Sequence, residues 1–159
     1  MDFSAPEGLV AEAGPASALL LTLHAAHAAR GSAAQGGPTD RRDLKTMSFN
    51  LATILRESAR RVPDHPALVA GEEQVPYHEL DRRSDAVASA LGAAGLRPGD
   101  VVGLQLPNLP EFVVSLYGIL KAGGVVLPMN PLNRAAEIHY MLADSAARFL
   151  VTTDSCAPE

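Results

Sequence analysis

The sequence predicts an α/β fold, in which a small parallel sheet is flanked by helices and preceded by an N-terminal β-hairpin. Three short apolar runs, at 101–106, 125–128 and 148–152, alternate with segments in which apolar residues recur at helical spacing. The runs are almost continuously apolar, which is typical of parallel strands covered on both faces. The spacing between the runs leaves room for crossover helices, so the order β-α-β-α-β predicts a parallel sheet.

A helix and a hairpin are predicted ahead of this unit. Asn50 is a favourable helix cap, and Pro63 stops the helix because proline disfavours helical geometry in the residue before it. The apolar positions between them fall at helical spacing: Leu51, Ile54, Leu55 and Val62. Strands are then expected at 67–70 and 74–77 around a turn at 71–73. Pro76 should confine its strand to the edge of a sheet, since proline has no N–H to donate.

An amphipathic helix comes next, and Gly95 is expected to end it with a left-handed cap. Its apolar stripe consists of Leu80, Val87, Ala88 and Leu91. The charged residues lie mostly off that stripe: Asp81, Arg82, Arg83 and Asp85. Pro98 and Gly99 form a turn before the first parallel strand, because proline fixes one central residue and glycine supplies a positive φ.

Two further helices connect the three parallel strands. The first is predicted over about 110–122 and is closed by Gly123 and Gly124. The second is predicted over about 135–144, with an apolar side formed by Ile138, Met141 and Leu142. These helices complete the two crossovers.

The chain divides at Met47 into two regions of different composition. Residues 1–46 are rich in Ala, Gly, Ser and Pro, and their one apolar run, at 18–23, is preceded by acidic rather than basic residues. This charge argues against a signal peptide, and the run is too short to span a bilayer. We interpret 1–46 as a disordered extension or as sequence upstream of a true start at Met47. Residues 47–159 are expected to be a truncated subdomain.

Composition excludes several classes of function. The formal net charge is −5 and the basic residues are scattered, which argues against nucleic-acid binding. The single cysteine, Cys156, forms no internal disulfide, and no Cys/His spacing matches a zinc site. These features fit a reducing cytoplasm, where we expect the protein to be located. No transmembrane segment is predicted.

No catalytic, cofactor-binding or metal-binding residue is assigned from the sequence. The stretch at 118–125 has the spacing of a phosphate loop, but Gly124 and Val125 stand where Lys and Ser or Thr are required. It also lies at a helix C-terminus, whose carbonyl groups repel anions. The adjacent carboxylates Glu72 and Glu73 are interpreted as solvated turn residues. The sequence has five histidines: His24, His27, His65, His78 and His139. His24 and His27 are interpreted as exposed residues of the N-terminal extension, and His78 and His139 as polar positions at a helix start or on a solvated face.

Several ordered motifs resemble the adenylate-forming (AMP-binding) superfamily. Residues 75–84, with Tyr77-His78-Glu79-Leu80, resemble its opening Tyr-x-Glu-Leu motif, and residues 120–131 are similar to its second motif. The segments at 95–102, 106–108 and 111–112 fit the same pattern in register. Asn130-Pro131 is closer to acyl-CoA synthetases than to peptide-synthetase adenylation domains, and the opening from Met47 resembles bacterial fatty-acid–CoA ligases. The resemblance covers Met47 to about Thr153.

The resemblance implies the first part of the large N-terminal domain of an acid–thiol ligase. Such an enzyme activates a carboxylic (fatty) acid with Mg-ATP to an acyl-adenylate and transfers the acyl group to coenzyme A. In the family, the phosphate loop, the acidic residues and the lysine for this chemistry lie beyond Glu159. We therefore expect the chain to be inactive alone, and ATP, Mg²⁺ and coenzyme A are implied only for a full-length enzyme.

Two alternatives remain open. In the first, the chain is a non-catalytic subunit or interaction module that complements a separately encoded remainder of the ligase. In the second, it is an unrelated small α/β binding module with a core of its own, for which cooperative unfolding of the isolated chain would be evidence.

Overall fold

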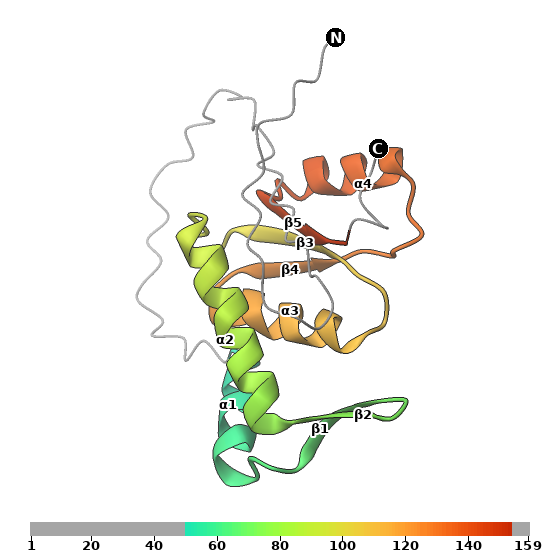
Figure 1. The fold of residues 1–159 in the computed structure, drawn as a ribbon. Helices are drawn as coiled ribbons and strands as arrows, with labels where there is room; N and C mark the ends of the chain where they lie inside the picture. The colour runs from blue at the N-terminus through green and yellow to red at the C-terminus, as the bar shows by residue number, and fades with distance from the viewer. Residues whose placement is uncertain (1–49, 154–159) are drawn as a thin grey trace.

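A computed structural model describes residues 50–153, which form two small sheets and four helices (Figure 1). The predictions for residues 1–46, His24, His27 and Cys156 lie outside the described residues. The order of elements is α1 (Ala52–Arg61), β1 (Pro66–Ala70), β2 (Glu73–Pro76), α2 (Tyr77–Ala93), β3 (Val101–Gln105), α3 (Pro110–Lys121), β4 (Val125–Pro128), α4 (Ala135–Asp144) and β5 (Phe149–Thr152). The predicted fold class is confirmed.

The central sheet has the order β4-β3-β5, and both pairings are parallel. Val101 pairs with Val125 of β4, and Val102 pairs with Phe149 of β5. The chain passes from β3 through α3 to β4 on one side and then returns through α4 to β5 on the other side of β3. Helices α3 and α4 lie on opposite faces of the sheet (Figure 1). The parallel sheet with flanking helices is the one that the alternating pattern predicts, and the helices on both faces make it doubly wound.

Each face of the sheet has its own hydrophobic cluster. The larger cluster lies toward α2 and α3, and its buried members are Leu91, Leu96, Val102, Leu104, Leu106, Ile119, Phe149 and Val151. The cluster toward α4 consists of Met129, Ile138 and Leu150, with Leu127, Met141 and Leu142 against it. Successive residues of β5 therefore point to opposite faces, and all four are buried. The predicted apolar side of α4 is confirmed.

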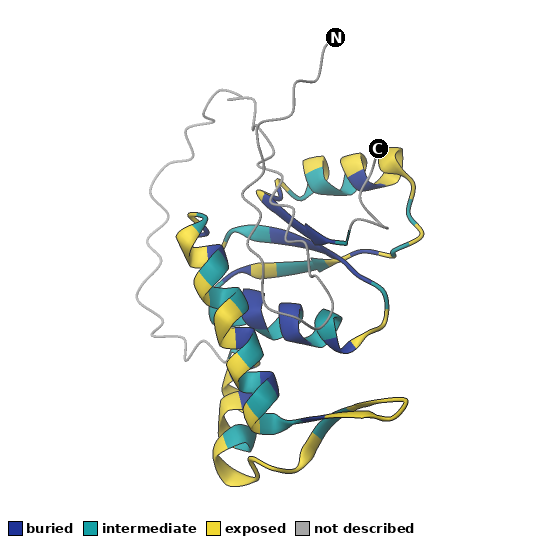
Figure 2. Cartoon of the chain, viewed as in Figure 1, coloured by how far each residue is buried: buried dark blue, intermediate teal, exposed yellow. Residues whose placement is uncertain are grey.

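A third cluster joins α1 and the hairpin to helices α2 and α3. It contains Leu55 of α1, Val75 of β2, Leu80 of α2 and Val114 of α3. The antiparallel hairpin β1–β2 turns at Gly71, whose φ is +62°, and projects away from the central sheet (Figure 1). Its outer surface is largely exposed, with Val69 at 66% (Figure 2).

Several predicted boundaries and exposures are corrected. Tyr77 is the first residue of α2 rather than the last of β2. Leu51, Ile54 and Val62 follow the helical period, but they remain at least 37% exposed because only Ala52 and Leu55 of α1 face the core. Strand β4 is only partly covered, with Val125 50% exposed, whereas β3 is covered on both faces as expected.

Glycine closes helices where the sequence predicts it. Gly95 and Gly123 follow α2 and α3 with φ of +89° and +81°, and Gly99 supplies φ +90° in the predicted turn. Ala146 follows α4 in the same left-handed region, at φ 52°, which is a strained conformation for a residue with a Cβ atom. Nothing in the sequence pattern indicates this exception.

Asn50 joins the start of α1 to α3; the cap position of α1 is Leu51, which makes no side-chain capping hydrogen bond, so the predicted cap lies one residue too early. The side-chain oxygen of Asn50 accepts the N–H of Ala52 at 2.9 Å, and its amide nitrogen donates to the carbonyl of Leu120 at 2.8 Å. We expect Asn50→Ala to lower the free energy of unfolding by about 1–1.5 kcal/mol, because it removes the acceptor of the Ala52 N–H and leaves the part-buried Leu120 carbonyl without its donor. Urea denaturation would measure this loss. The exposed Asn108 provides the control, and an equal loss for Asn108→Ala would contradict a specific role for Asn50.

Candidate functional site

The carboxyl ends of β3 and β4 border an open, apolar groove. This is the edge at which parallel α/β sheets bind ligands. The groove measures about 410 Å³ and is lined by Leu106, Asn108, Phe112, Pro128, Met129, Asn130 and Pro131. None of these residues carries a charge. The groove therefore supplies neither a cation for a phosphate nor a carboxylate for Mg²⁺.

A buried polar cluster links the same ends of all three strands. Gln105 is fully buried, its amide nitrogen lies 3.4 Å from the carbonyl of Asn130, and its oxygen lies 3.5 Å from the hydroxyl of Thr152. Both hydrogen bonds are long. Asn130 also accepts the N–H of Leu132 through its side-chain oxygen at 2.9 Å. These contacts hold the loop after β4 against the end of β3.

The segment at 118–125 is a helix C-terminus, as the sequence predicts. The N–H of Gly123 donates to the carbonyl of Leu120, and that of Gly124 donates to Ile119 at 2.9 Å. Its carbonyls, rather than free N–H groups, dominate this end of α3. The geometry is that of a capped helix and not of a phosphate loop.

Lys121 lies at the end of α3, and the sequence does not reveal its surroundings. Its side chain is only 1% exposed, and its ammonium donates to Asp81 Oδ1 at 2.5 Å, to the Asp81 carbonyl at 2.7 Å and to Asp85 Oδ1 at 2.8 Å. Asp81 and Asp85 therefore contact α3, which their position off the apolar stripe of α2 does not indicate. All three ammonium donors are used, so the cluster is a structural contact between helices.

Glu79, in the Tyr-x-Glu-Leu motif, forms a second charged cluster at the start of α2. Arg82 donates to its carboxylate at 2.7 and 2.8 Å and Arg83 at 2.8 Å. These hydrogen bonds, first from Arg82 and then from Arg83, lower the pKa of Glu79 from 4.5 to about 2. The role of this motif residue in the structure is to fix the first turns of α2.

The lowered pKa of Glu79 predicts a pH-dependent contribution to stability. A carboxylate with a lower pKa in the folded state stabilises above the unfolded value of 4.5, and the stabilisation is lost as the pH falls toward 2. Since Arg82 is 70% exposed, solvent screening limits the contribution to about 1 kcal/mol. We expect Glu79→Gln to be less stable than wild type by this amount at pH 6 and equally stable near pH 2, in urea titrations at both values. Glu57→Gln, in an exposed pair with Arg60, should show no such convergence.

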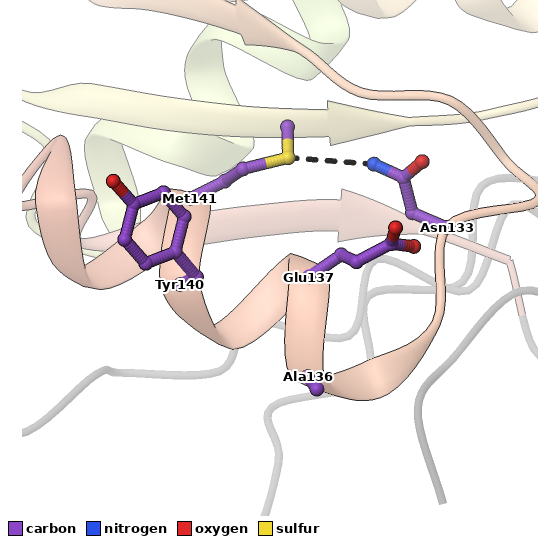
Figure 3. A pocket seen from close by; sticks show the side chains of 5 residues that line it. All are labelled: Asn133, Ala136, Glu137, Tyr140 and Met141. Carbon is purple, nitrogen blue, oxygen red and sulfur yellow. Dashed lines mark hydrogen bonds between the residues drawn. The ribbon is translucent and has the colours of Figure 1, made fainter.

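The remaining candidates lie on solvated surfaces. His65, His139, Glu72 and Glu73 are exposed, and His78 lies 3.0 Å from the carbonyl of Pro63 at the base of the hairpin. Within residues 50–153, no three His, Cys, Asp or Glu side chains are placed to bind a metal ion. A second shallow hollow, of about 470 Å³, lies beside α4 and is lined by Asn133, Ala136, Glu137, Tyr140 and Met141 (Figure 3). There Asn133 contacts the Met141 sulfur at 3.4 Å, and Glu137 accepts the Arg134 N–H.

None of the helices within 50–153 has both the length and the apolar character needed to cross a bilayer.

The fold and the motif geometry define an α/β domain of the adenylate-forming class. Residues 55–159 match the family described as AMP-binding enzyme. The match extends over more than half of the chain, and the chain belongs to this family.

Relatives of three kinds share this region. The chain is 43% identical over 109 residues to a salicyl-AMP ligase / salicyl-S-ArCP synthetase of Mycobacterium tuberculosis, which covers 65% of the chain and 19% of that protein. It is 37% identical over 117 residues to a long-chain-fatty-acid–CoA ligase of Bacillus subtilis, with coverage of 74% and 21%. It is 37% identical over 113 residues to gramicidin S synthase 2 of Brevibacillus brevis, with coverage of 69% and 2%. The chain thus spans about a fifth or less of these relatives.

Solved structures agree with the fold. The N-terminal domain of FACL13 from Mycobacterium tuberculosis matches with a TM-score of 0.64 and 30% identity, covering 69% of this chain and 28% of that one. The N-terminal subdomain of NpsA from Klebsiella oxytoca matches with a TM-score of 0.65 and 28% identity, covering 69% and 29%. The prediction that residues 50–153 resemble the first part of such an N-terminal domain is confirmed.

Proposed function

We propose that the chain is the N-terminal part of an ATP-dependent acyl-CoA ligase, which forms an acyl-adenylate from a carboxylic acid and then a coenzyme A thioester. The main support is the similarity to the long-chain-fatty-acid–CoA ligase. It covers 74% of the chain, compared with 65% for the salicyl-AMP ligase and 69% for gramicidin S synthase 2. The Asn130-Pro131 sequence after β4, which resembles that of acyl-CoA synthetases, supports the same choice.

The described residues contribute a framework to this reaction. Adenylation requires cationic and N–H donors for phosphate oxygens and carboxylates for Mg²⁺. The groove at the carboxyl ends of β3 and β4 has no charged lining residue, and Lys121 is already bound by three oxygens. We therefore assign no described residue to ATP, Mg²⁺ or coenzyme A. We propose that the domain begins near Met47 and that 50–153 form the first part of a larger N-terminal domain.

A second candidate is the activation of an aromatic acid for transfer to a carrier protein. The support is the identity to the salicyl-AMP ligase / salicyl-S-ArCP synthetase, which is 43% compared with 37% for the fatty-acid ligase. The two candidates share the adenylation step and differ in the acid and in the thiol that accepts the acyl group.

ATP–pyrophosphate exchange separates these candidates. The gene would be sequenced through and beyond the codon of Glu159, and the longest frame containing this chain would be expressed and assayed with fatty acids, aromatic acids and amino acids. Exchange with a fatty acid, together with thioester formation on coenzyme A, supports the ligase. Exchange with an aromatic acid and no coenzyme A thioester supports the second candidate.

The 159-residue chain alone is the matched control in the same assay. We expect it to give background exchange with every acid, because the described residues lack groups for the phosphates. Measurable exchange by the chain alone would show that its framework role is wrong. Absence of exchange by the longest frame with all three acid classes would contradict both candidates.

A further inference from the structure

Helix α1 presents a second apolar face, which is directed away from the core. Ala52 and Leu55 are buried, whereas Leu51 is 53% exposed and Ile54 is 47% exposed. Leu51, Ile54 and Ser58 recur at i, i+3 and i+7, so they form one stripe along the helix. Much of α1 is exposed (Figure 2), and within residues 50–153 this stripe has no covering element.

The same face carries a positive charge without a counter-charge. Arg61 follows Ile54 by seven residues and is exposed, so it lies near the end of the stripe. Arg60 pairs with Glu57 at 3.2 Å, but Arg61 pairs with no carboxylate of residues 50–153. An apolar stripe that ends in an unpaired cation favours an occupant that combines apolar side chains with acidic ones.

The face is too small to hold a separate protein. Helix α1 has 10 residues and is therefore about 15 Å long, and a helix is about 10 Å wide. Specific interfaces between proteins bury roughly 800 Å² on each partner. A tethered segment needs less area, because its attachment gives it an effective concentration in about the millimolar range. An occupant from the same chain is therefore favoured over a second copy.

The sequence ahead of α1 contains a segment of the required composition. The apolar run at 18–23 supplies four leucines. Asp2, Glu7 and Glu12 precede the run, and no Lys or Arg occurs before Arg30. Residues 24–49 join the run to the start of α1, and fully extended they would span roughly 90 Å, several times the length of the helix.

We propose that the run at 18–23 packs against the outward face of α1. Its leucines contact Leu51 and Ile54, and the acidic residues ahead of the run lie near Arg61. The contact removes both exposed side chains of α1 from water, and that burial is the source of its stability. This inference goes beyond the proposed function and does not depend on it.

Paramagnetic broadening in the ¹⁵N-labelled 159-residue chain tests this contact. A nitroxide would be attached at Ser17→Cys in a Cys156→Ser background, which gives the label a single site next to the run. The amide signals of the outward face of α1 should be lost or strongly weakened, compared with the same sample after reduction of the nitroxide. The amide signals of α4 should keep their intensity and serve as the internal control.

Three variants relate the broadening to the proposed contact. Leu20→Asp places a charge in the run and should lower the docked population by about ten-fold or more, which restores the α1 signals. Ile54→Asp should have the same effect from the other side of the contact, and its exposure allows the substitution without loss of the fold. Val69→Asp, at an exposed apolar site on the hairpin, is the matched control and should leave the broadening unchanged.

Three outcomes would overturn the proposal. The first is broadening that is spread evenly over residues 50–153 or centred on Leu132 and Tyr140, which are also exposed. The second is broadening of α1 that persists in both Leu20→Asp and Ile54→Asp. The third is equal broadening when the spin-labelled ¹⁴N chain is mixed with an unlabelled ¹⁵N chain, which would identify a second copy as the occupant.

Discussion

Lys121→Ala is expected to lower the free energy of unfolding by about 3 kcal/mol, measured by urea denaturation. The ammonium is 1% exposed and joins α3 to α2 through the Asp81 and Asp85 carboxylates and the Asp81 carbonyl. Removing one partner of a buried ion pair leaves the other charges poorly compensated, at a cost of about 3–5 kcal/mol. Asp85 is 58% exposed and is partly solvated without its partner, so we expect the lower end of this range.

Two further variants separate charge from packing at this site. Lys121→Met retains most of the aliphatic stem and removes only the ammonium, so its loss should be about 2 kcal/mol. Arg60→Ala, which breaks the exposed pair with Glu57, should change stability by no more than about 0.5 kcal/mol. A loss for Lys121→Ala as small as that for Arg60→Ala would mean that the buried pair adds nothing beyond an exposed one.

Gly118→Ala is expected to destabilise the chain by about 2–3 kcal/mol through overpacking of the contact between α2 and α3. A Cβ atom at Gly118 would lie 2.5 Å from Val87 Cγ1, 2.6 Å from Val87 Cβ and 3.2 Å from the backbone oxygen of Ser84. The side chain of valine is stiff at χ1, and the backbone of α2 cannot move without disturbing the Lys121 contacts. The helices must therefore separate, and the neighbouring core would lose contact.

Gly92→Ala in α2 is the matched control for this substitution. No atom lies within 4 Å of a Cβ placed at Gly92, so alanine should leave stability unchanged or raise it by about 0.5–1 kcal/mol. Thermal or urea unfolding of both variants would test the pair. If the Gly118→Ala and Gly92→Ala variants were equally stable, the contact between α2 and α3 would adapt to an added methyl group at little cost.

The secondary structure was largely predictable because the period of the apolar residues differs between strands and helices. Helix α4 and strand β4 have the predicted bounds, and Gly95 and Gly123 end their helices as expected. The contacts of Asp81 and Asp85 were not predictable because helical spacing shows where residues lie around one helix, whereas their partner Lys121 is 36–40 residues away. Ala146 was missed because a left-handed residue other than glycine has no sequence signal.

The candidate site was less predictable than the fold. The sequence indicated correctly that 118–125 is a helix end rather than a phosphate loop. The groove at 106–112 and 128–131 combines side chains from the loop after β3, the first turn of α3, the end of β4 and the loop after β4, so no local motif marks it. The hydrogen bonds that join Gln105 to Asn130 and Thr152 likewise depend on the register of three strands. Such contacts join residues that lie far apart in the sequence, and the spacing of apolar residues does not reveal them.

The strand order β4-β3-β5 has a consequence for the route by which the chain folds. Pairing β3 with β4 brings together residues about 24 positions apart, whereas pairing β3 with β5 spans about 47. Loop closure grows slowly with length, so the second pairing costs only about 0.6 kcal/mol more than the first. The β3-α3-β4 unit also buries Ile119 and contacts α2 directly, whereas the chain reaches β5 only after α4, against which Leu150 packs. We therefore expect β3-α3-β4 to form the folding nucleus and β5 to add last, with low φ-values at Leu150 and Val151.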